Sequence, residues 1–286
     1  MFQRLTGAFV RAILVVLMIT TPALLLPGVS NDATQIVALV AVFAAVLTFF
    51  EYASVYPGLV EFRDAPPFNR IRFVSLFATV LLISVVILAD TTETTLTQFV
   101  QVLGSALARS IDFPYSPVRF LVLMLPNDSS AHHIEQVRTA AGIAYLISLL
   151  TLGFFIVILR TMGWPNSNSG FNVWVNLPTF DPTAGGDVVD RLRRDAWLNA
   201  ALGVFLPFLI PPALKLISTL FTPVALTSPQ TMIWTVTAWA FLPASLFMRG
   251  IAMNRIAAMI DERRRVNTAS DAAEYTAPAR PNLSRV

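Results

Sequence analysis

The chain has 286 residues, of which 55% are hydrophobic and 13% are charged, and its formal net charge is +3. Soluble domains usually carry about 25% charged residues, so this composition argues against a soluble protein and indicates a membrane protein. Cysteine is absent from the sequence, which excludes disulfides, thiolate metal sites and cysteine nucleophiles.

Six apolar stretches are long enough to cross the roughly 30 Å hydrocarbon core of a bilayer as helices. They cover residues 12–29, 35–57, 73–89, 140–159, 198–221 and 232–248. The sequence therefore predicts an all-α fold, a polytopic membrane helical bundle with six transmembrane helices. Residues 1–265 form the predicted membrane domain, and the polar composition of residues 266–286 predicts a disordered tail.

The first apolar stretch follows a short basic segment that contains Arg4 and Arg11. A basic start before an apolar run is typical of a secretory signal peptide, which would be cleaved. No clear A-x-A cleavage site follows, so an uncleaved first helix is the preferred interpretation.

The basic residues are distributed unevenly between the segments that connect the predicted spans. Sixteen of them fall in the N-terminus, the 2–3 loop, the 4–5 connector and the C-terminus, against three in the other set, Arg109, Arg119 and Arg138. The positive-inside rule then predicts that both termini are cytoplasmic. Only one basic residue is a lysine, a bias consistent with a GC-rich bacterial genome. The predicted location is the bacterial inner membrane, crossed several times.

The long outer loop between the third and fourth spans carries two short apolar segments. Apolar residues at positions 96, 99, 100, 103 and 107 recur at helical spacing, which predicts an amphipathic helix lying on the outer membrane surface or capping the bundle. VRFLVLML, residues 118–125, is too short to cross as a helix. It is either a re-entrant segment lining a pathway or an interfacial hairpin packed on the bundle, and the hairpin is favoured.

The two cytoplasmic connectors have less regular patterns. The loop around Pro66 and Pro67 mixes acidic and basic residues, which suits either a fixed docking surface or a salt-bridged turn. In the 4–5 connector, apolar residues alternate with others over residues 171–177, which predicts a short strand or a surface-lying segment. Acids and arginines at i, i+4 spacing over residues 187–194 predict a helix leading into the fifth span.

The fifth span is the least regular of the six. Pro207, Pro211 and Lys215 are four residues apart and share one helical face, and Pro212 follows directly after Pro211. Because Pro211 and Pro212 lack N–H groups, the carbonyls of Pro207 and Phe208 need donors from a neighbouring helix or water. The span therefore predicts a kinked helix packed against others.

Two ionisable residues lie within or near predicted spans, where a charge is a functional-site hypothesis by default. Glu51 lies near the cytoplasmic end of the second span, and Lys215 lies near the outer end of the fifth. At a rise of 1.5 Å per residue they are too far apart to pair, and Lys215 can reach the headgroups. Each remains a candidate as a single site. The adjacent pair His132 and His133 lacks the i, i+4 spacing of a zinc site and is interpreted as a solvated surface pair.

The sequence contains no P-loop, G-x-G-x-x-G, G-x-S-x-G or H-E-x-x-H motif, so we expect no enzymatic activity, no cofactor and no metal. The candidate functional residues are Lys215, Pro207, Pro211, Pro212 and Glu51. We expect a protein that acts by interaction, as an accessory, assembly or scaffold subunit of a membrane complex. Its expected partners are the lipid bilayer and other membrane proteins, not nucleic acid. The alternative is a small-solute or ion transporter or channel that uses the proline-kinked fifth helix.

Overall fold

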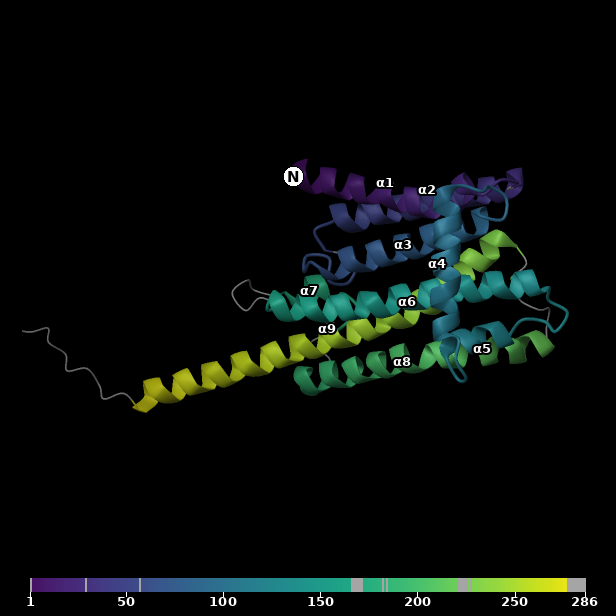
Figure 1. Ribbon diagram of the computed structural model, residues 1–286. Coiled ribbons are helices and arrows are strands. Elements are labelled where there is room, and N and C mark those ends of the chain that lie inside the picture. The colour runs from purple at the N-terminus through teal and green to yellow at the C-terminus, as the bar shows by residue number, and fades with distance from the viewer. Residues whose placement is uncertain are drawn as a thin grey trace, which may run out of the picture.

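The computed structural model describes residues 2–28, 30–56, 58–165, 172–181, 183, 185–220, 226 and 228–276, and this part of the chain is all-α. The elements are α1 (Phe2–Leu25), α2 (Asn31–Ala53), α3 (Phe68–Leu88), α4 (Thr95–Ile111), α5 (Pro117–Leu123), α6 (Ala131–Thr161), α7 (Val173–Asn176), α8 (Val188–Leu220) and α9 (Pro229–Thr276). Six of them, α1, α2, α3, α6, α8 and α9, are long and apolar enough to cross a membrane. They run roughly along one common direction (Figure 1), which agrees with the predicted bundle of six spans.

Several helices are longer than the apolar stretches that predicted them, because polar turns at their ends are helical too. α1 begins at Phe2 and not near residue 12, and α8 begins at Val188, because the charged helix predicted to lead into the fifth span is continuous with it. α9 continues to Thr276, so residues 266–276 of the predicted disordered tail are helical. The prediction for residues 277–286 lies outside the described residues.

The helix starts follow local sequence signals. Ser30, Ser116 and Ser130 each accept a hydrogen bond from the backbone N–H three residues later, which satisfies one of the free donors at the starts of α2, α5 and α6. Thr94 and Thr97 form a reciprocal capping box at the start of α4. These hydroxyl caps define where each helix enters from its loop.

The most extensive helix pair is α8 with α9. At Gly203, an added Cβ would lie 2.7 Å from the carbonyl oxygen of Pro243, and at Gly250 it would lie 2.6 Å from that of Ala196. Glycine at both positions therefore lets the two backbones approach directly, as small residues do in membrane helix pairs. α9 also packs on α3 and α6, and together these helices enclose the main apolar core around Ile83, Val236 and their neighbours.

α1 and α2 form a hairpin at the edge of the bundle. α2 packs along α1, and Ala41 is its one buried position among the described residues. Most of the large apolar side chains of α2 are exposed, and these are Ile36, Leu39, Val40, Val42, Phe43, Val46, Leu47 and Phe50. On the other side, α1 packs against α3, so the hairpin joins the bundle mainly through one helix.

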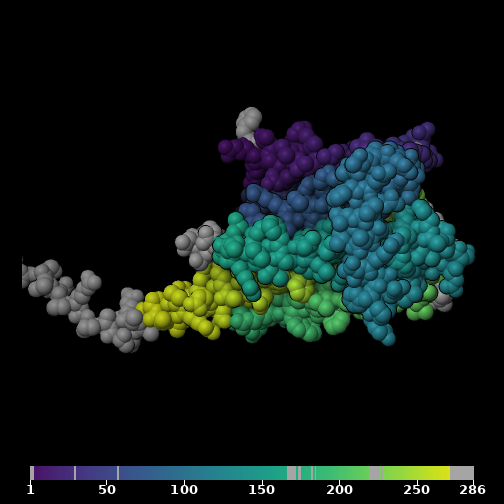
Figure 2. All heavy atoms as spheres, in the orientation of Figure 1, coloured from purple at the N-terminus to yellow at the C-terminus, as the bar shows by residue number. Residues whose placement is uncertain are grey.

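α4 crosses the bundle nearly at right angles and lies on its surface (Figures 1 and 2). The contact with α6 is made by small residues, since Ala108 and Gly104 pack against Gly142, Thr139 and Ile143. Larger apolar residues that predicted this helix, including Leu96, Phe99 and Leu103, point away from the bundle and are exposed. α4 therefore lies across the side of the bundle and does not cap its end, and its place on the outer membrane surface stays a prediction.

The segment 118–125 folds into the two-turn helix α5 and the turn after it. Val118 and Leu121 are completely buried, and α5 packs on α6 and α8. The segment is therefore a short buried helix at the end of the bundle opposite the start of α1. Whether it acts as a re-entrant segment or as an interfacial hairpin stays a prediction.

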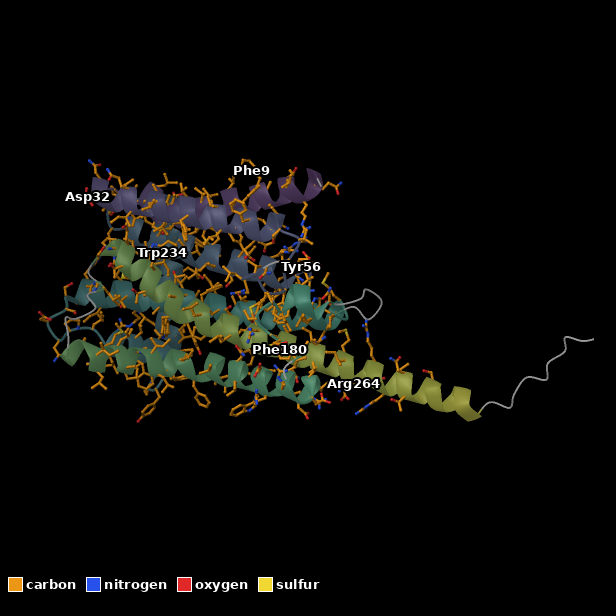
Figure 3. The ribbon with its side chains drawn as sticks, turned by 180° about the vertical axis from the view of Figure 1, so that it is seen from behind. Phe9, Asp32, Tyr56, Phe180, Trp234 and Arg264 are labelled. Carbon is orange, nitrogen blue, oxygen red and sulfur yellow. The ribbon has the colours of Figure 1, made fainter. Side chains whose placement is uncertain are left out.

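We call the end of the bundle where α1 begins, α2 ends and α3 begins the base. Figure 3 shows Tyr56, Phe180 and Arg264 at this end and Asp32 and Trp234 at the other. The connector between α2 and α3 is folded inward, because Phe62 is fully buried in a second apolar core with Leu177 and Phe180. Leu177 and Phe180 belong to the connector between α6 and α8, which are the fourth and fifth spans. This connector contains the helical turn α7, so the predicted short strand is wrong.

The buried connector is held by Asn176. Its carbonyl accepts from the N–H of Phe62 at 2.7 Å, and its side-chain oxygen accepts from that of Asp64 at 3.3 Å. A helical turn at Val173–Asn176 presents both acceptors to one loop, which an extended strand edge would not do. The two connectors therefore form one packed unit.

Candidate functional site

The three prolines of α8 differ in burial. Pro207 and Pro211 are buried against the rest of the bundle, whereas Pro212 is exposed. The carbonyl of Pro207, which lacks its helical donor, accepts a hydrogen bond from the indole N–H of Trp239 at 3.0 Å. The neighbouring helix therefore supplies the expected donor at this position. A donor for the carbonyl of Phe208 stays a prediction.

Lys215 does not point into the bundle. Its side chain is exposed, and its ammonium group donates to the carbonyl oxygen of Leu123, the last residue of α5. The final carbonyls of a helix lack intrahelical donors and carry partial negative charge, so a cation is favoured there. Lys215 thus attaches α5 to α8 at the end of the bundle opposite the base.

Glu51 is also bound by backbone groups. Its carboxylate accepts hydrogen bonds from the N–H groups of Gly58, Leu59 and Val60, at 3.0 to 3.1 Å for its Oε2 atom. The turn after α2 therefore wraps around this carboxylate, much as backbone N–H groups surround a bound anion. The charge is satisfied by the chain that follows it.

The structure therefore does not bring the sequence-predicted residues together into one site. Glu51 lies at the base, Lys215 lies near α5 at the opposite end, and Pro207 and Pro211 lie between α8 and α9. Glu51, Lys215 and the carbonyl of Pro207 each have a hydrogen-bond partner in the chain. Two other arrangements at the base were missed by sequence reasoning, and both involve arginine.

The first arrangement is a joint between the 2–3 connector and α9. The carboxylate of Glu61 binds the guanidinium of Arg249 through two hydrogen bonds of 2.6 and 2.8 Å, and it also accepts from the hydroxyl of Thr179 at 2.7 Å. Burial alone would raise the pKa of Glu61, but the hydrogen bonds from Arg249 and Thr179 outweigh it and hold the pKa below its usual value. The carboxylate is therefore ionised and fixes the connector to the last helix.

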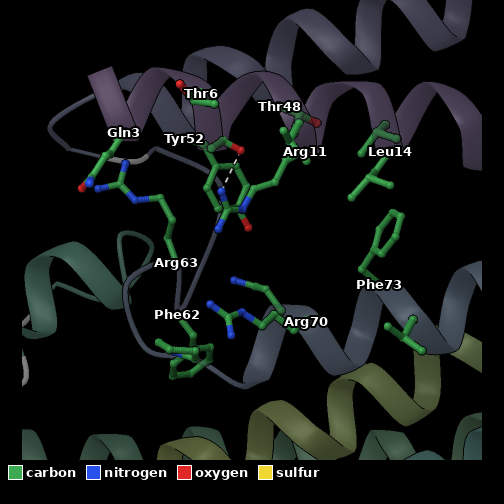
Figure 4. A pocket seen from close by; sticks show the side chains of 16 residues that line it. Gln3, Thr6, Arg11, Leu14, Thr48, Tyr52, Phe62, Arg63, Arg70 and Phe73 are labelled. Atoms are coloured by element: carbon green, nitrogen blue, oxygen red, sulfur yellow. Dashed lines mark hydrogen bonds between the residues drawn. The ribbon is translucent and has the colours of Figure 1, made fainter. Parts of the chain in front are cut away.

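The second arrangement is a cleft of about 820 Å³ between α1, the end of α2 and the start of α3. Its lining changes along its length. Polar and basic residues gather toward the base, and these are Gln3, Thr6, Arg11, Arg63, Asn69 and Arg70. Further along α1 and α3 the lining is apolar, and it includes Val10, Leu14, Val15, Phe73 and Val74. Figure 4 shows this division between the arginines on one side and Leu14 and Phe73 on the other.

The three arginines of the cleft have different roles. Arg63 is almost completely buried, and it donates to the carbonyls of Glu51, Ser54 and Val55 and binds its neighbour Asp64. Its guanidinium is therefore committed to holding the 2–3 connector in place.

Arg11 and Arg70 lack acidic partners within the described part of the chain. The guanidinium of Arg11 lies 4.6 Å from the centre of the Tyr52 ring, an ordinary cation–π distance, and donates one hydrogen bond to the carbonyl of Gly7. Arg70 is exposed at the edge of the cleft, and no ion pair or hydrogen bond of its side chain is seen among the described residues. Both charges are uncompensated by carboxylates.

The sequence held only a partial signal for this cleft. Arg11, Arg63 and Arg70 were counted as evidence for orientation, but their convergence depends on how the α1–α2 hairpin packs on α3. That packing is made by non-polar residues without a distinctive spacing. Arginines near the ends of predicted spans indicate a membrane interface, but they do not indicate that their side chains line one cleft.

Among the residues that the structure describes, no group of three or more His, Asp or Glu side chains could hold a metal ion. His132 lies 3.3 Å from Asp90 at the end of the bundle opposite the base, within a polar pocket of about 250 Å³ that also contains Gln136 and Arg109. The pocket also contains Glu135, but its carboxylate binds Arg109 and Arg138, so it is engaged in ion pairs.

No protein-family model matches the chain, and neither the curated proteins nor the solved structures contain a significant match to it.

Proposed function

We propose that this protein acts by interaction, as an accessory, assembly or scaffold subunit of a membrane complex. The observation that carries the proposal is the part of α9 that leaves the bundle. Every residue from Glu262 to Ser270 is exposed, and the helix extends well beyond the other helices at the base (Figure 1). Isolated helices of this length are marginal in water, so a helix that buries nothing in its own chain suits a surface for a partner.

The base gives this helix a fixed starting point. Arg193 binds Asp261 at 2.9 Å and Arg264 binds Asp187 at 2.7 Å, so two ion pairs connect α9 to α8 and to the turn before it. Hydrogen bonds from Arg264 lower the pKa of Asp187, which keeps this carboxylate ionised. Together with the Glu61–Arg249 pair, these contacts orient the helix relative to the membrane spans.

The test is purification of the full chain from its native membrane in a mild detergent or in lipid particles, with the mass of the intact complex measured. We expect a partner at fixed stoichiometry that is lost when residues 266–286 are removed. That truncation leaves both ion pairs of the base in place. An Asp187→Asn variant is the matched control, because it weakens one ion pair without shortening the helix. A chain that runs alone under every condition would remove the basis of the proposal.

The transport alternative has less support from the geometry. Its candidate groups, Lys215 and Glu51, are bound by backbone carbonyls and N–H groups, and the carbonyl of Pro207 is bound by Trp239. Liposome flux measurements across a panel of ions and small solutes discriminate between the two functions. Flux above that of empty liposomes, abolished by Lys215→Ala, would replace the interaction proposal with transport.

A further inference from the structure

We propose that the cleft between α1, α2 and α3 is a specific binding site for one anionic phospholipid, with the phosphate at Arg11 and Arg70. This inference does not depend on a protein partner. It rests on the size of the cleft, the order of its lining residues and the balance of charges around it.

The charge balance at the base favours an anion. The acidic side chains nearest the cleft already have partners, since Asp64 binds Arg63, Glu51 binds backbone N–H groups and Glu61 binds Arg249. Arg11 and Arg70 are left facing the cleft without a carboxylate among the described residues. Guanidinium groups bind phosphate oxygens through paired hydrogen bonds, which makes them suitable ligands for a headgroup.

Neutral polar groups surround the same end of the cleft. Gln3 and Thr6 on α1 and Asn69 on α3 contribute hydrogen-bonding side chains beside the two arginines. The ring of Tyr52 lies under Arg11 and keeps its guanidinium beside the cleft (Figure 4). A phosphate diester with a hydroxylated headgroup matches this combination of cations and neutral donors.

The apolar part of the cleft distinguishes a lipid from a soluble anion. Beyond Arg11 the lining of α1 continues to Val15, about 6 Å along the helix at 1.5 Å per residue, and that of α3 continues from Arg70 to Val74. This apolar stretch is shorter than one leaflet of a bilayer whose hydrocarbon core is roughly 30 Å thick, and it would contact the part of an acyl chain next to the headgroup. Leu14, Phe73 and Val74 would contact an acyl chain, whereas free phosphate would leave them unoccupied.

The helix arrangement leaves room for a chain to enter sideways. Among the described residues α2 packs mainly on α1, so no extended helix–helix contact closes the cleft between α2 and α3. A bound lipid would fill this space and add contacts between the hairpin and the bundle. Basic pockets between membrane helices on the side that carries the positive charges are suited to anionic headgroups.

The experiment uses the full chain in lipid particles made of phosphatidylcholine with a minor fraction of phosphatidylglycerol. Intact-mass measurement counts the lipids that stay bound after release from the particles. We expect one phosphatidylglycerol per chain, and about fivefold less retention in Arg11→Gln or Arg70→Gln, the ratio that the loss of one basic contact to an anionic lipid gives.

Arg160→Gln is the matched control. Arg160 is an exposed arginine at the C-terminal end of α6, on the same end of the bundle, and it does not line the cleft. Its substitution should leave lipid retention unchanged. Equal losses in Arg160→Gln and Arg70→Gln would show that the lipid responds to general surface charge, and would overturn the proposal.

A second variant covers the case in which the arginine variants fold poorly. Val74→Trp fills the apolar part of the cleft and leaves both arginines in place. We expect it to reduce phosphatidylglycerol retention while the chain remains monodisperse. Unchanged retention in Val74→Trp, equal retention of phosphatidylcholine, or displacement of the bound lipid by excess inorganic phosphate would each refute a phospholipid site.

Discussion

The α8–α9 pair and the α1–α2 hairpin are both antiparallel pairs of membrane helices, yet they are built differently. In the first pair, Gly203 and Gly250 let each backbone touch the other helix directly. In the hairpin, Ala41 is the one buried position of α2 within the described residues, and the larger side chains face outward. One pair is closed by its own packing, and the other leaves a cleft beside it.

The difference shows what holds membrane helices together. Lipid tails are as apolar as leucine, so helices gain little from hiding apolar side chains from them, and close packing or hydrogen bonds must supply the attraction. The α8–α9 pair has both, including the bond from Trp239 to Pro207. The hairpin instead depends on α3 and on the polar contacts of the base, which makes its position sensitive to what fills the cleft.

The largest expected difference comes from adding one methyl group to each pair. Gly203→Ala would place a Cβ 2.7 Å from the carbonyl oxygen of Pro243 and 2.6 Å from the Cβ of Phe247, and neither neighbour can move freely. We expect a loss of about 3 kcal/mol in the free energy of unfolding. Gly7→Ala in α1 meets only the mobile end of Arg11, at 2.9 Å, and should cost less than about 0.5 kcal/mol. Thermal unfolding in one detergent compares them, and equal costs would break the comparison.

The ion pair between Glu61 and Arg249, which connects the α2–α3 connector to α9, gives the next largest effect. Glu61→Gln removes the charge that binds Arg249, and leaving that guanidinium partly buried without its partner should cost about 2 kcal/mol. Because the pKa of Glu61 is lowered in the folded state, its contribution is present above its ordinary value of 4.5 and is lost as the pH falls through the lowered folded value.

Unfolding measured from neutral pH down to acidic pH checks this sign. The wild type should lose stability below about pH 4.5 by more than Glu61→Gln does. Glu262→Gln, which changes an exposed acid on α9, is the control and should follow the wild type. If the free energy of unfolding depended on pH in the same way for the wild type and Glu61→Gln, the ion pair would not hold the connector between α2 and α3.

A smaller effect is expected within the α8–α9 pair. Trp239→Phe keeps an aromatic ring but removes the N–H that binds the carbonyl of Pro207, which should cost about 1 kcal/mol. Trp197→Phe is the control because its side chain is 69% exposed. Denaturant titration of both variants measures the difference in their unfolding midpoints. Equal midpoints would indicate that water replaces the indole as the donor to the carbonyl of Pro207.

The smallest effect is expected where α8 contacts α5. Lys215→Met removes the donor to the carbonyl of Leu123, an exposed contact worth about 0.5 kcal/mol or less, and Lys215→Arg retains a donor. We expect faster amide hydrogen exchange in α5 for Lys215→Met alone, with global stability unchanged. Faster exchange throughout α8 would instead assign Lys215 a role in the α8–α9 pair.

Much of the fold could be predicted from apolar run length, since the six spans follow from hydrocarbon thickness alone. Helix bounds were less predictable, because charged turns such as the start of α8 join a span without changing its apolar signal. The alternation over residues 171–177 indicated a strand, but burial of Leu177 and the bonds of Asn176 to the 2–3 connector favour a helical turn. Those contacts are tertiary, and a local pattern does not contain them.

The candidate site was less predictable for a related reason. The proline pattern correctly indicated that the carbonyl of Pro207 needs a donor from outside its helix, because every proline lacks a backbone N–H. The roles of Glu51 and Lys215 depend on which backbone groups come within reach, and these belong to distant or later segments. The cleft needs three helices to converge, and none of its residues has a distinctive spacing.

The bond between Glu61 and Arg249 has a consequence for biogenesis. Its partners are 188 residues apart in the chain, so at about 5–20 residues per second Glu61 waits about 10 to 40 s for Arg249 to be synthesised. Trp239, which donates to the carbonyl of Pro207 in α8, arrives in the same last helix. A polypeptide released before α9 would have an unpaired carboxylate at the base and a bare carbonyl within a span.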